Sequence, residues 1–381
     1  MERLYVETRI AQSPKHAGAL CGDVAAVERT ASSTTLIVSD GMGSGTSAHL
    51  SATLAVAHLT ARLREGASFR NAFMSTIRIQ HTARGTDLPY AVLAVARIRH
   101  DGSTTVLTYE APPPLLLMRH HAAVPEMKKT YLGVEEVGEL NCHLASGEGV
   151  LLMTDGITQA GMGETSPRGF GPEGACRYVD NIWRGDYAPG DIAQGLHDCV
   201  RGIWGVGGDD CTVATGFCRP GVTATILTGP PENREHDRVV VGRFLSAPGR
   251  KVICGATTAK VVSAVSRRPL KDPPEPFSLI APPGQQMDGI DLVSEGAITL
   301  TQVCNVLDAA SIHFTEISAV SELYEILTTA DHVHLMVGGA SNEGNDSVAF
   351  LQQGILTRRQ IVPLLAGKLR ERGKLVTIEA C

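Results

Sequence analysis

The stretch Ser39-Asp-Gly-Met-Gly-Ser-Gly-Thr46 (SDGMGSGT) joins the apolar run TTLIVSD at 34–40 to a helical pattern at 46–65. The run is rich in β-branched and apolar residues, which predicts a strand with Asp40 at its end. A carboxylate before a glycine-rich turn is compatible with a phosphate cradle, a metal site or an ordinary tight connection. The turn alone leaves these three interpretations open.

The composition limits the classes of protein to consider. At 381 residues the chain is long enough for two domains, and a net charge of -6 without a dense Lys/Arg block argues against a nucleic-acid partner. The chain begins without a signal pattern and no apolar run approaches ~20 residues, so we expect a cytoplasmic protein that does not enter a membrane. Nine cysteines without any C-x-x-C pair argue against a disulfide framework or a zinc ribbon and are expected to be mostly buried.

Residues 1–218 are predicted to form an α+β layered sandwich, because their strands come in groups and their helices in pairs. A hairpin is predicted at His100–Ser103, where Asp-Gly suits a tight turn. The predicted strands are 34–40, 90–98, 103–110, 149–155 and 211–218. The predicted helices are 46–65, 69–81 and about 190–203.

Residues 219–381 follow another pattern, in which apolar strands alternate with single helices. Strands are expected in TATILTG, RKVICG, DHVHLMVGG and KLVTIEA, and helices in ENREHDRVVVGRFL, ATTAKVVSAVSRR and about 357–372. Such alternation predicts a second domain of the α/β class with a mainly parallel sheet. The Pro-rich piece at 270–284 is expected to be a surface loop.

The acidic residues of the first domain share a position at strand ends beside glycine. Convergent carboxylates repel one another unless a cation neutralises them, so a hard divalent metal is the economical explanation for the set. For any one of them, Asp-Gly turn chemistry is an equally ordinary reading. The residues concerned are Asp23, Asp40, Asp155, Asp209 and Asp210.

Three motifs occur in order along the chain: SDGMGSG at 39–45, LLMTDG at 151–156 and GGDDCTV at 207–213. Together they resemble the motifs of the PPM, or phosphatase 2C-like, metal-dependent protein serine/threonine phosphatases. DGMGSG followed by a long helix resembles more narrowly the bacterial sporulation stage II protein E subfamily. The resemblance covers approximately residues 10–218. It implies an αββα sandwich of two antiparallel sheets with helices outside and two Mn²⁺ or Mg²⁺ ions at one end.

The resemblance also implies roles for single residues. Asp40 would bridge the two ions and the Gly41 carbonyl would ligate one of them, while Asp155, Asp209 and Asp23 would supply the remaining protein ligands. Asp40, Asp155 and Asp209 would thereby be the catalytic residues, since a water between the two ions becomes the nucleophile that attacks phosphorus. The residues expected to support these ligands from behind are Gly156 and Asp210.

The implied substrate is phosphoserine or phosphothreonine on a protein, with an anti-sigma-factor antagonist as one candidate. The proton donor for the leaving group stays open between His16, His81 and a metal-bound water, and the residue that grips phosphate stays open between Arg9 and Lys15. Two features depart from the subfamily: LPYAVLAVARI at 88–98 lacks its polar segment, and only GMGETSPRGFG at 161–171 is left as a flap.

The second domain carries one suggestive stretch, VICGATTAKVV at 252–262. A helix that starts after Gly255, near Thr257 and Thr258, could bind an anion such as a nucleotide or another small phosphate ligand, although Thr257 as a simple helix cap is an alternative. Similar glycine-bearing strand ends occur in TILTGPP at 225–231 and VGGASNEGND at 337–346. His332 and His334 alternate on one strand and face either a metal or solvent.

Two further hypotheses remain beside the phosphatase. The first domain is a catalytically weak, phosphatase-like binding module controlled by a ligand-sensing or partner-docking α/β domain, or the α/β half is itself the enzyme. Four carboxylates at strand ends favour the phosphatase, since a pure scaffold does not need to gather them.

Overall fold

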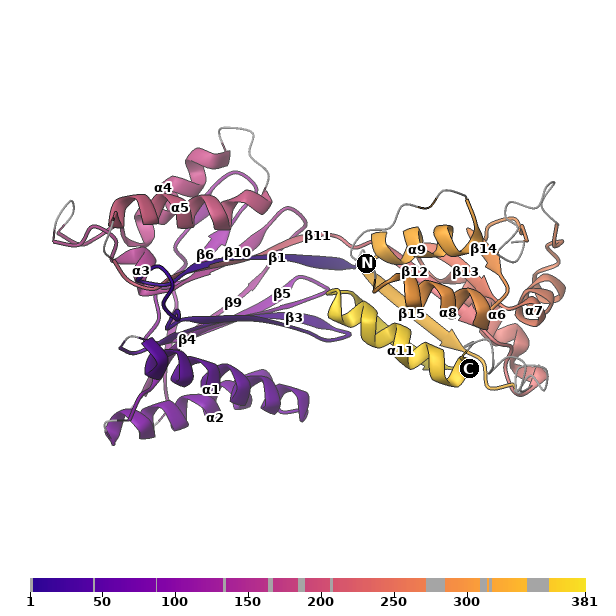
Figure 1. Ribbon diagram of the computed structural model, residues 1–381, viewed down its shortest axis with the longest axis horizontal. Coiled ribbons are helices and arrows are strands. Elements are labelled where there is room, and N and C mark those ends of the chain that lie inside the picture. Colours follow the sequence, from indigo (N-terminus) through magenta and orange to yellow (C-terminus); the bar gives the residue numbers. More distant parts are fainter. Residues whose placement is uncertain are drawn as a thin grey trace. The chain divides into compact units, whose positions relative to one another are not determined.

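The computed structural model describes residues 3–43, 45–86, 88–132, 135–163, 167–183, 189–205, 208–271, 285–308, 314, 317–340 and 356–381. Ser44, Gly207, most of the Pro-rich piece 270–284, part of 161–171 and the end of 337–346 therefore lie outside the described residues. The chain divides into two compact units, Met1–Pro220 and Gly221–Cys381 (Figure 1).

The first unit contains two antiparallel sheets that face each other. One sheet has the order β1-β11-β10-β6-β7 and the other the order β2-β3-β4-β5-β9-β8. The strands of the first sheet are β1 (Leu4–Ser13), β6 (Leu115–Leu117), β7 (Ala122–Ala123), β10 (Gly149–Met153) and β11 (Cys211–Pro220). Those of the second are β2 (Val24–Arg29), β3 (Ser33–Gly41), β4 (Ala91–Arg99), β5 (Ser103–Tyr109), β8 (Lys128–Leu132) and β9 (Glu135–His143).

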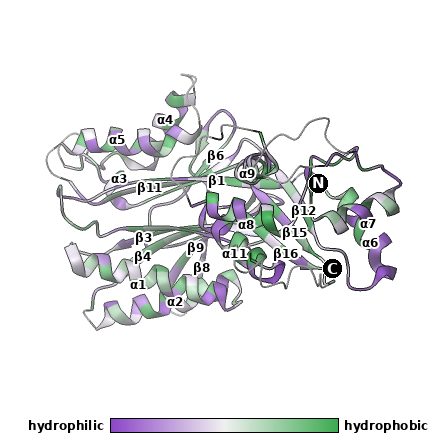
Figure 2. Cartoon of the chain, turned by 45° about the vertical axis from the view of Figure 1, so that its right-hand side comes forward, coloured by the Kyte–Doolittle hydropathy of each residue, from purple (hydrophilic) through white to green (hydrophobic). Residues whose placement is uncertain are grey.

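Helices cover the outer face of each sheet (Figure 1). The helices α1 (Gly45–Arg64) and α2 (Phe69–Gly85) pack on the sheet that contains β3, whereas α4 (Gly171–Trp183) and α5 (Ile192–Trp204) pack on the other. Figure 2 shows the mixture of hydrophobic and hydrophilic residues along these helices that one-sided packing requires. The predicted sandwich of two antiparallel sheets between helices is confirmed.

Strand β3 explains why an uninterrupted apolar run lies next to Asp40. Its Leu36 and Val38 point into the core between the two sheets, while Ile37 points into the core under α1 and α2. Both faces of the strand are therefore buried, and alternation of polar and apolar residues is absent. The hairpin between β4 and β5 is also confirmed, with Gly102 at φ 87° and Asp101 Oδ1 accepting from Ser103 N at 2.9 Å.

The prediction between Asp155 and Gly207 was incomplete. Helix α4 was not expected there, although its inward residues Ala175, Val179 and Ile182 are buried against the sheet. Its two glycines and a proline lowered its apparent helix propensity, and packing against the sheet overrides that preference. The short elements α3 (Asp155–Thr158) and η1 (Pro189–Asp191) complete this region.

The second unit is an α/β domain with a parallel sheet, as predicted, and its strand order is doubly wound. Its five strands all pair in parallel in the order β14-β13-β12-β15-β16. They are β12 (Thr223–Thr228), β13 (Arg250–Cys254), β14 (Leu292–Ser294), β15 (His332–Val337) and β16 (Leu375–Ala380).

Helices cover both faces of this parallel sheet. One core cluster joins the sheet to α6 (Asp237–Ser246) and α7 (Ala256–Ser266), and another joins its opposite face to α8 (Ala297–Val306), α9 (Ala319–Thr329) and α11 (Arg358–Glu371). A short turn of 3₁₀ helix, η2 (Arg234–His236), precedes α6. The elements β14, α8 and α9 were not predicted, although the buried residues of α9 follow helical spacing and were an available signal.

Two histidines of β15 differ from their predicted surroundings. His332 is buried, and His334 Nε2 lies 3.1 Å from Glu379 Oε2 on β16. The interpretation of an exposed strand face is wrong for His332, which is only 3% exposed, whereas His334 is partly exposed. Cys254 is buried as expected, and none of the described helices is long and apolar enough to span a membrane.

Candidate metal centre

Asp40 and Gly41 end the interior strand β3, opposite Val92 and Ala91 of β4. A Cβ atom on Gly41 would lie 2.0 Å from the carbonyl oxygen of Ala48, so α1 packs directly against the backbone of the strand end. Gly45, the first residue of α1, has φ 70°. Glycines in SDGMGSGT therefore serve a close approach and a turn, which leaves the Asp40 side chain at the edge of the sheet.

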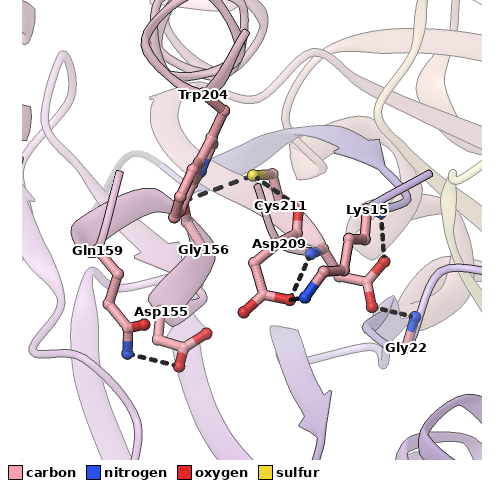
Figure 3. Close-up of polar contacts among 9 residues, drawn as sticks. Lys15, Gly22, Asp155, Gly156, Gln159, Trp204, Asp209 and Cys211 are labelled. Carbon is pink, nitrogen blue, oxygen red and sulfur yellow. Dashed lines mark hydrogen bonds and ion pairs between the residues drawn. The ribbon is translucent and has the colours of Figure 1, made fainter. Parts of the chain in front are cut away.

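Asp155 and Gly156 begin α3 just beyond β10. Asp155 Oδ2 accepts a hydrogen bond from Gln159 Nε2 at 2.8 Å, and the Gly156 carbonyl accepts one from Trp204 Nε1 at 2.8 Å (Figure 3). A Cβ atom on Gly156 would lie 2.0 Å from the carbonyl oxygen of Asp210. The glycine thus lets the start of α3 pack on the loop before β11, which places Asp155 beside Asp209.

Asp209 and Asp210 have different surroundings although they are adjacent. Asp210 is buried, and its carboxylate accepts from Lys15 N at 2.7 Å and Gly22 N at 2.9 Å, so it ties the loop before β11 to the loop before β2. Among the described residues, Asp209 accepts a hydrogen bond from the backbone N–H of Asp210 alone, at 3.0 Å, and it lies 3.9 Å from Lys15 Nζ. In Figure 3 the side chains of Asp155 and Asp209 reach to the same side of these loops.

Asp23 directly precedes β2 and is only 2 % exposed. Its Oδ2 accepts hydrogen bonds from the hydroxyls of Thr154, at 2.9 Å, and Thr212, at 2.7 Å. Its Oδ1 is buried and has no hydrogen-bond partner among the described residues. A buried carboxylate oxygen without a donor is unfavourable, so this atom is available to a cation.

Residues 30–215 match a protein-family model described as stage II sporulation protein E (SpoIIE). These residues form a SpoIIE-family domain. The predicted family is thereby confirmed for this part of the chain, which contains α1 and the acidic strand ends at Asp40, Asp155 and Asp209, whereas β1, β2 and Asp23 precede it. No curated protein sequence matches the chain.

Several solved structures are similar to part of the chain. The PP2C phosphatase domain with a regulatory fragment of Bacillus subtilis SpoIIE has 22% identity and a TM-score of 0.49, over 57% of this chain and 65% of that one. A second crystal form of that phosphatase domain has 21% identity and a TM-score of 0.44, over 58% and 95%. The RsbU and RsbW domains of a Mycobacterium tuberculosis protein have 16% identity and a TM-score of 0.47, over 64% and 68%.

The carboxylates of the SpoIIE-family domain oppose one another's ionisation. Burial, followed by the charges of Asp23, Asp155 and Asp209, raises the pKa of Asp40 to about 10. Burial also raises the pKa of Asp23 to about 7, with the hydroxyls of Thr212 and Thr154 acting in the opposite direction. The pKa of Asp209 is raised as well, again mainly by burial. Asp40 therefore lies within electrostatic range of the other three carboxylates.

The four carboxylates have the chemistry to bind divalent cations, although they do not surround a common ion position in this structure. Within the described ranges, no three His, Cys, Asp or Glu side chains lie close enough to hold a metal ion together. The carboxylates interact over longer distances, and a cation of +2 charge would remove the repulsion that raises their pKa values. Oxygen-only donors, with the unpartnered Asp23 Oδ1 among them, are the ligands that Mg²⁺ and Mn²⁺ prefer.

Several polar residues of the site were not predicted. Thr154 and Thr212 hold Asp23, and Gln159 holds Asp155. Gln12 Nε2 donates to the Asp23 carbonyl and to Thr212 Oγ1, each at 3.0 Å. These four residues lie inside or near one of the three motifs, or on the strand beside it. Polar residues within otherwise apolar strands were therefore the sequence feature that could have predicted them.

The open alternatives for the phosphate grip and the proton donor differ in position. Lys15 lies beside Asp209, whereas Arg9 pairs with Glu7 at 2.8 Å on β1. His16 is exposed on the loop after β1, and His81 lies in α2. Among the described residues, Lys15 is therefore the cation that lies within 4 Å of Asp209.

The predicted ligand residues of the second unit border the carboxyl edge of its sheet. Gly255 is the N-cap of α7 and has φ 125°, with no side chain capping the helix. The alternative in which Thr257 caps the helix is wrong, because Thr257 lies inside the first turn and is exposed. Thr258, one residue further, is buried.

Proposed function

We propose that residues 1–220 are a metal-dependent protein phosphatase that hydrolyses phosphoserine or phosphothreonine on a protein. The observation that supports it most is the approach of Asp40 to Asp155 and Asp209, which lie with it in the SpoIIE-family region, and to Asp23, which precedes that region. A structural role alone does not account for this group, because buried carboxylates that repel one another destabilise a fold unless they are neutralised.

In this proposal Asp23, Asp40, Asp155, Asp209 and the Gly41 carbonyl hold two Mn²⁺ or Mg²⁺ ions. Such a pair supplies a water of lowered pKa as nucleophile and neutralises charge on the phosphoryl oxygens. The protein's own contribution is to orient these ligands from strand ends whose positions are set by close backbone contacts.

Other residues position the ligands and the substrate. The hydroxyls of Thr154 and Thr212 fix the Oδ2 atom of Asp23, which would leave its Oδ1 atom free to hold an ion. Gln159 orients Asp155 in the same way, and Asp210 keeps the loop of Lys15 beside Asp209. The Lys15 ammonium, 3.9 Å from Asp209, is proposed to hold a phosphate oxygen of the substrate.

The test is phosphate release from p-nitrophenyl phosphate and from a phosphoserine protein, with and without Mn²⁺. We expect activity that depends on the metal and falls by at least about a hundredfold in Asp40→Asn, because an electrostatic contact to the reacting centre contributes that much. Asp198→Asn is the matched control, since Asp198 is 63% exposed on α5. An Asp40→Asn rate equal to that of the wild type would end the proposal.

A protein that binds Mn²⁺ yet releases no phosphate would favour the catalytically weak binding module instead. To separate the two, metal binding is measured by calorimetry on the same preparations. The anti-sigma-factor antagonist is tested last, as a phosphorylated protein substrate compared with an unrelated phosphoserine protein. Equal rates on both would remove that specific substrate while leaving the phosphatase.

A further inference from the structure

The second unit contains a cavity of ≈ 600 Å³ at the carboxyl edge of its parallel sheet. The ends of β12 and β13 and the starts of α6, α7 and α8 border it. In open, doubly wound sheets, ligands bind outside the carboxyl ends of the strands. The volume lies in the range of small-molecule and cofactor sites.

Two helices begin at this cavity without a capping side chain. Gly255 precedes α7 and Gly296 precedes α8, and neither helix start has a side-chain cap bond. A Cβ atom on Gly296 would lie 3.0 Å from the Cα atom of Gly255, so the two starts lie against each other. The first intrahelical bonds come from Ala259 and Leu300, which leaves three backbone N–H groups ahead of each without an intrahelical acceptor.

Hydroxyl groups at the same cavity also lack partners. Thr258 and Thr228 line the cavity, each only 2 % exposed, and within the described part of the chain neither side chain makes a hydrogen bond. A buried hydroxyl normally finds a partner, so these two are available to a ligand. Lys260, two residues further along α7, lines the cavity and forms no ion pair with any described residue. The donors at this end of the cavity suit an anion.

Asp237, the first residue of α6, presents a hydrogen-bond acceptor instead of a donor. Its Oδ1 is buried at the cavity and has no hydrogen-bond partner among the residues described. A simple anion cannot donate a hydrogen bond to this carboxylate oxygen. The ligand therefore also needs a donor group such as a sugar hydroxyl. The wall of Val261, Val265 and Ile298 adds an apolar surface.

We propose that this cavity binds a nucleotide, with its phosphates at the starts of α7 and α8 and its sugar hydroxyls toward Asp237. The phosphates accept from the free N–H groups and from Thr258, while the base lies on the apolar wall. Inorganic pyrophosphate satisfies only the first of these requirements and therefore binds more weakly than a nucleotide. This assignment does not depend on the activity of the first unit.

The experiment is titration calorimetry of the full chain with ATP, ADP, AMP, GTP and inorganic pyrophosphate. EDTA is present, so that no metal-dependent hydrolysis consumes the probes. We expect at least one of the four nucleotides to bind the chain saturably. Its affinity should fall about tenfold in Thr258→Val, because a hydrogen bond from the hydroxyl to a charged group is lost. Lys260→Gln, a change at an exposed residue, is expected to weaken it several-fold.

Thr299→Val is the matched control. Thr299 occupies the third position of α8 as Thr258 does in α7, and its hydroxyl is also buried without a partner, but it does not line the cavity. The nucleotide affinity of Thr299→Val should stay within about twofold of the wild-type value, and the nucleotide affinity of Asp40→Asn should be unchanged. Absence of saturable binding by all four nucleotides overturns the proposal, as does pyrophosphate binding as tight as ADP. Wild-type affinity in both Thr258→Val and Lys260→Gln overturns it equally.

Discussion

Replacing Asp40 by Asn is expected to change how the stability of the metal-free first unit depends on pH. Asp40 has a pKa of about 10 in the folded protein, far above the ordinary aspartate value of 3.8. Between these two values the folded chain holds a proton that the unfolded chain has released. The free energy of unfolding therefore falls as the pH rises from about 4 towards 10.

The size of this effect follows from one proton per folded molecule. Each pH unit changes the free energy of unfolding by about 1.4 kcal/mol per bound proton. Between pH 7 and 9 Asp40 alone lowers it by up to about 2.7 kcal/mol, an upper limit because this side chain is only partly buried. Asp23, with a pKa of about 7, has largely lost its proton over this interval and adds little.

Tryptophan fluorescence measures this quantity for the first unit alone. The protein contains two tryptophans, Trp183 and Trp204, and both lie in that unit. Urea unfolding in EDTA at pH 7, 8 and 9 is compared between the wild type, Asp40→Asn and the exposed control Asp198→Asn. We expect the pH slope to flatten in Asp40→Asn only. Equal slopes in the wild type and Asp40→Asn would refute the electrostatic reasoning.

Three further outcomes are expected from the same unit. Gly41→Ala should lower the free energy of unfolding by about 3 kcal/mol, because its Cβ atom would overlap the backbone of α1. Gly85 has open space around it, so Gly85→Ala should leave the free energy of unfolding unchanged. Equal urea midpoints for the two variants would contradict this reasoning. Thr212→Val removes the shorter of the two hydroxyl bonds to Asp23 and should cost about 1–3 kcal/mol in the same assay, unless that bond contributes nothing. Mn²⁺ at a hundred times its Kd should stabilise the wild type by about 2.7 kcal/mol and leave Asp40→Asn unchanged; a shift in both would place the ion elsewhere.

The strand ends that carry the acidic residues could be predicted because their signals are local. An apolar run that stops at Asp-Gly marks both the end of a strand and a tight backbone contact, as at Asp40-Gly41 and at Asp155-Gly156. The alternation of strands and helices after residue 219 is equally local, and it led to the parallel sheet. Both patterns lie within about ten residues of the chain.

The partners of the acidic residues could not be predicted in the same way. Thr212 donates to Asp23 across 189 positions of the sequence, and Thr154 does so across 131. Such contacts depend on the register between β1, β10 and β11 and on the approach of two sheets, which no single segment encodes. A threonine inside an apolar strand looks like an ordinary β-former until that register is known.

The two units leave polar groups of opposite kinds unsatisfied, and this difference predicts different ligands. In the first unit the groups without enough partners are acceptors, namely the Asp23 Oδ1 atom and the mutually repelling carboxylates around Asp40, which cations satisfy. In the second unit they are mainly donors, the N–H groups at two glycine-capped helix starts and the hydroxyl of Thr258, which anions satisfy. These differences support the proposed hydrolytic site in the first unit and the proposed nucleotide site in the second, and Asp40→Asn and Thr258→Val test the two proposals separately.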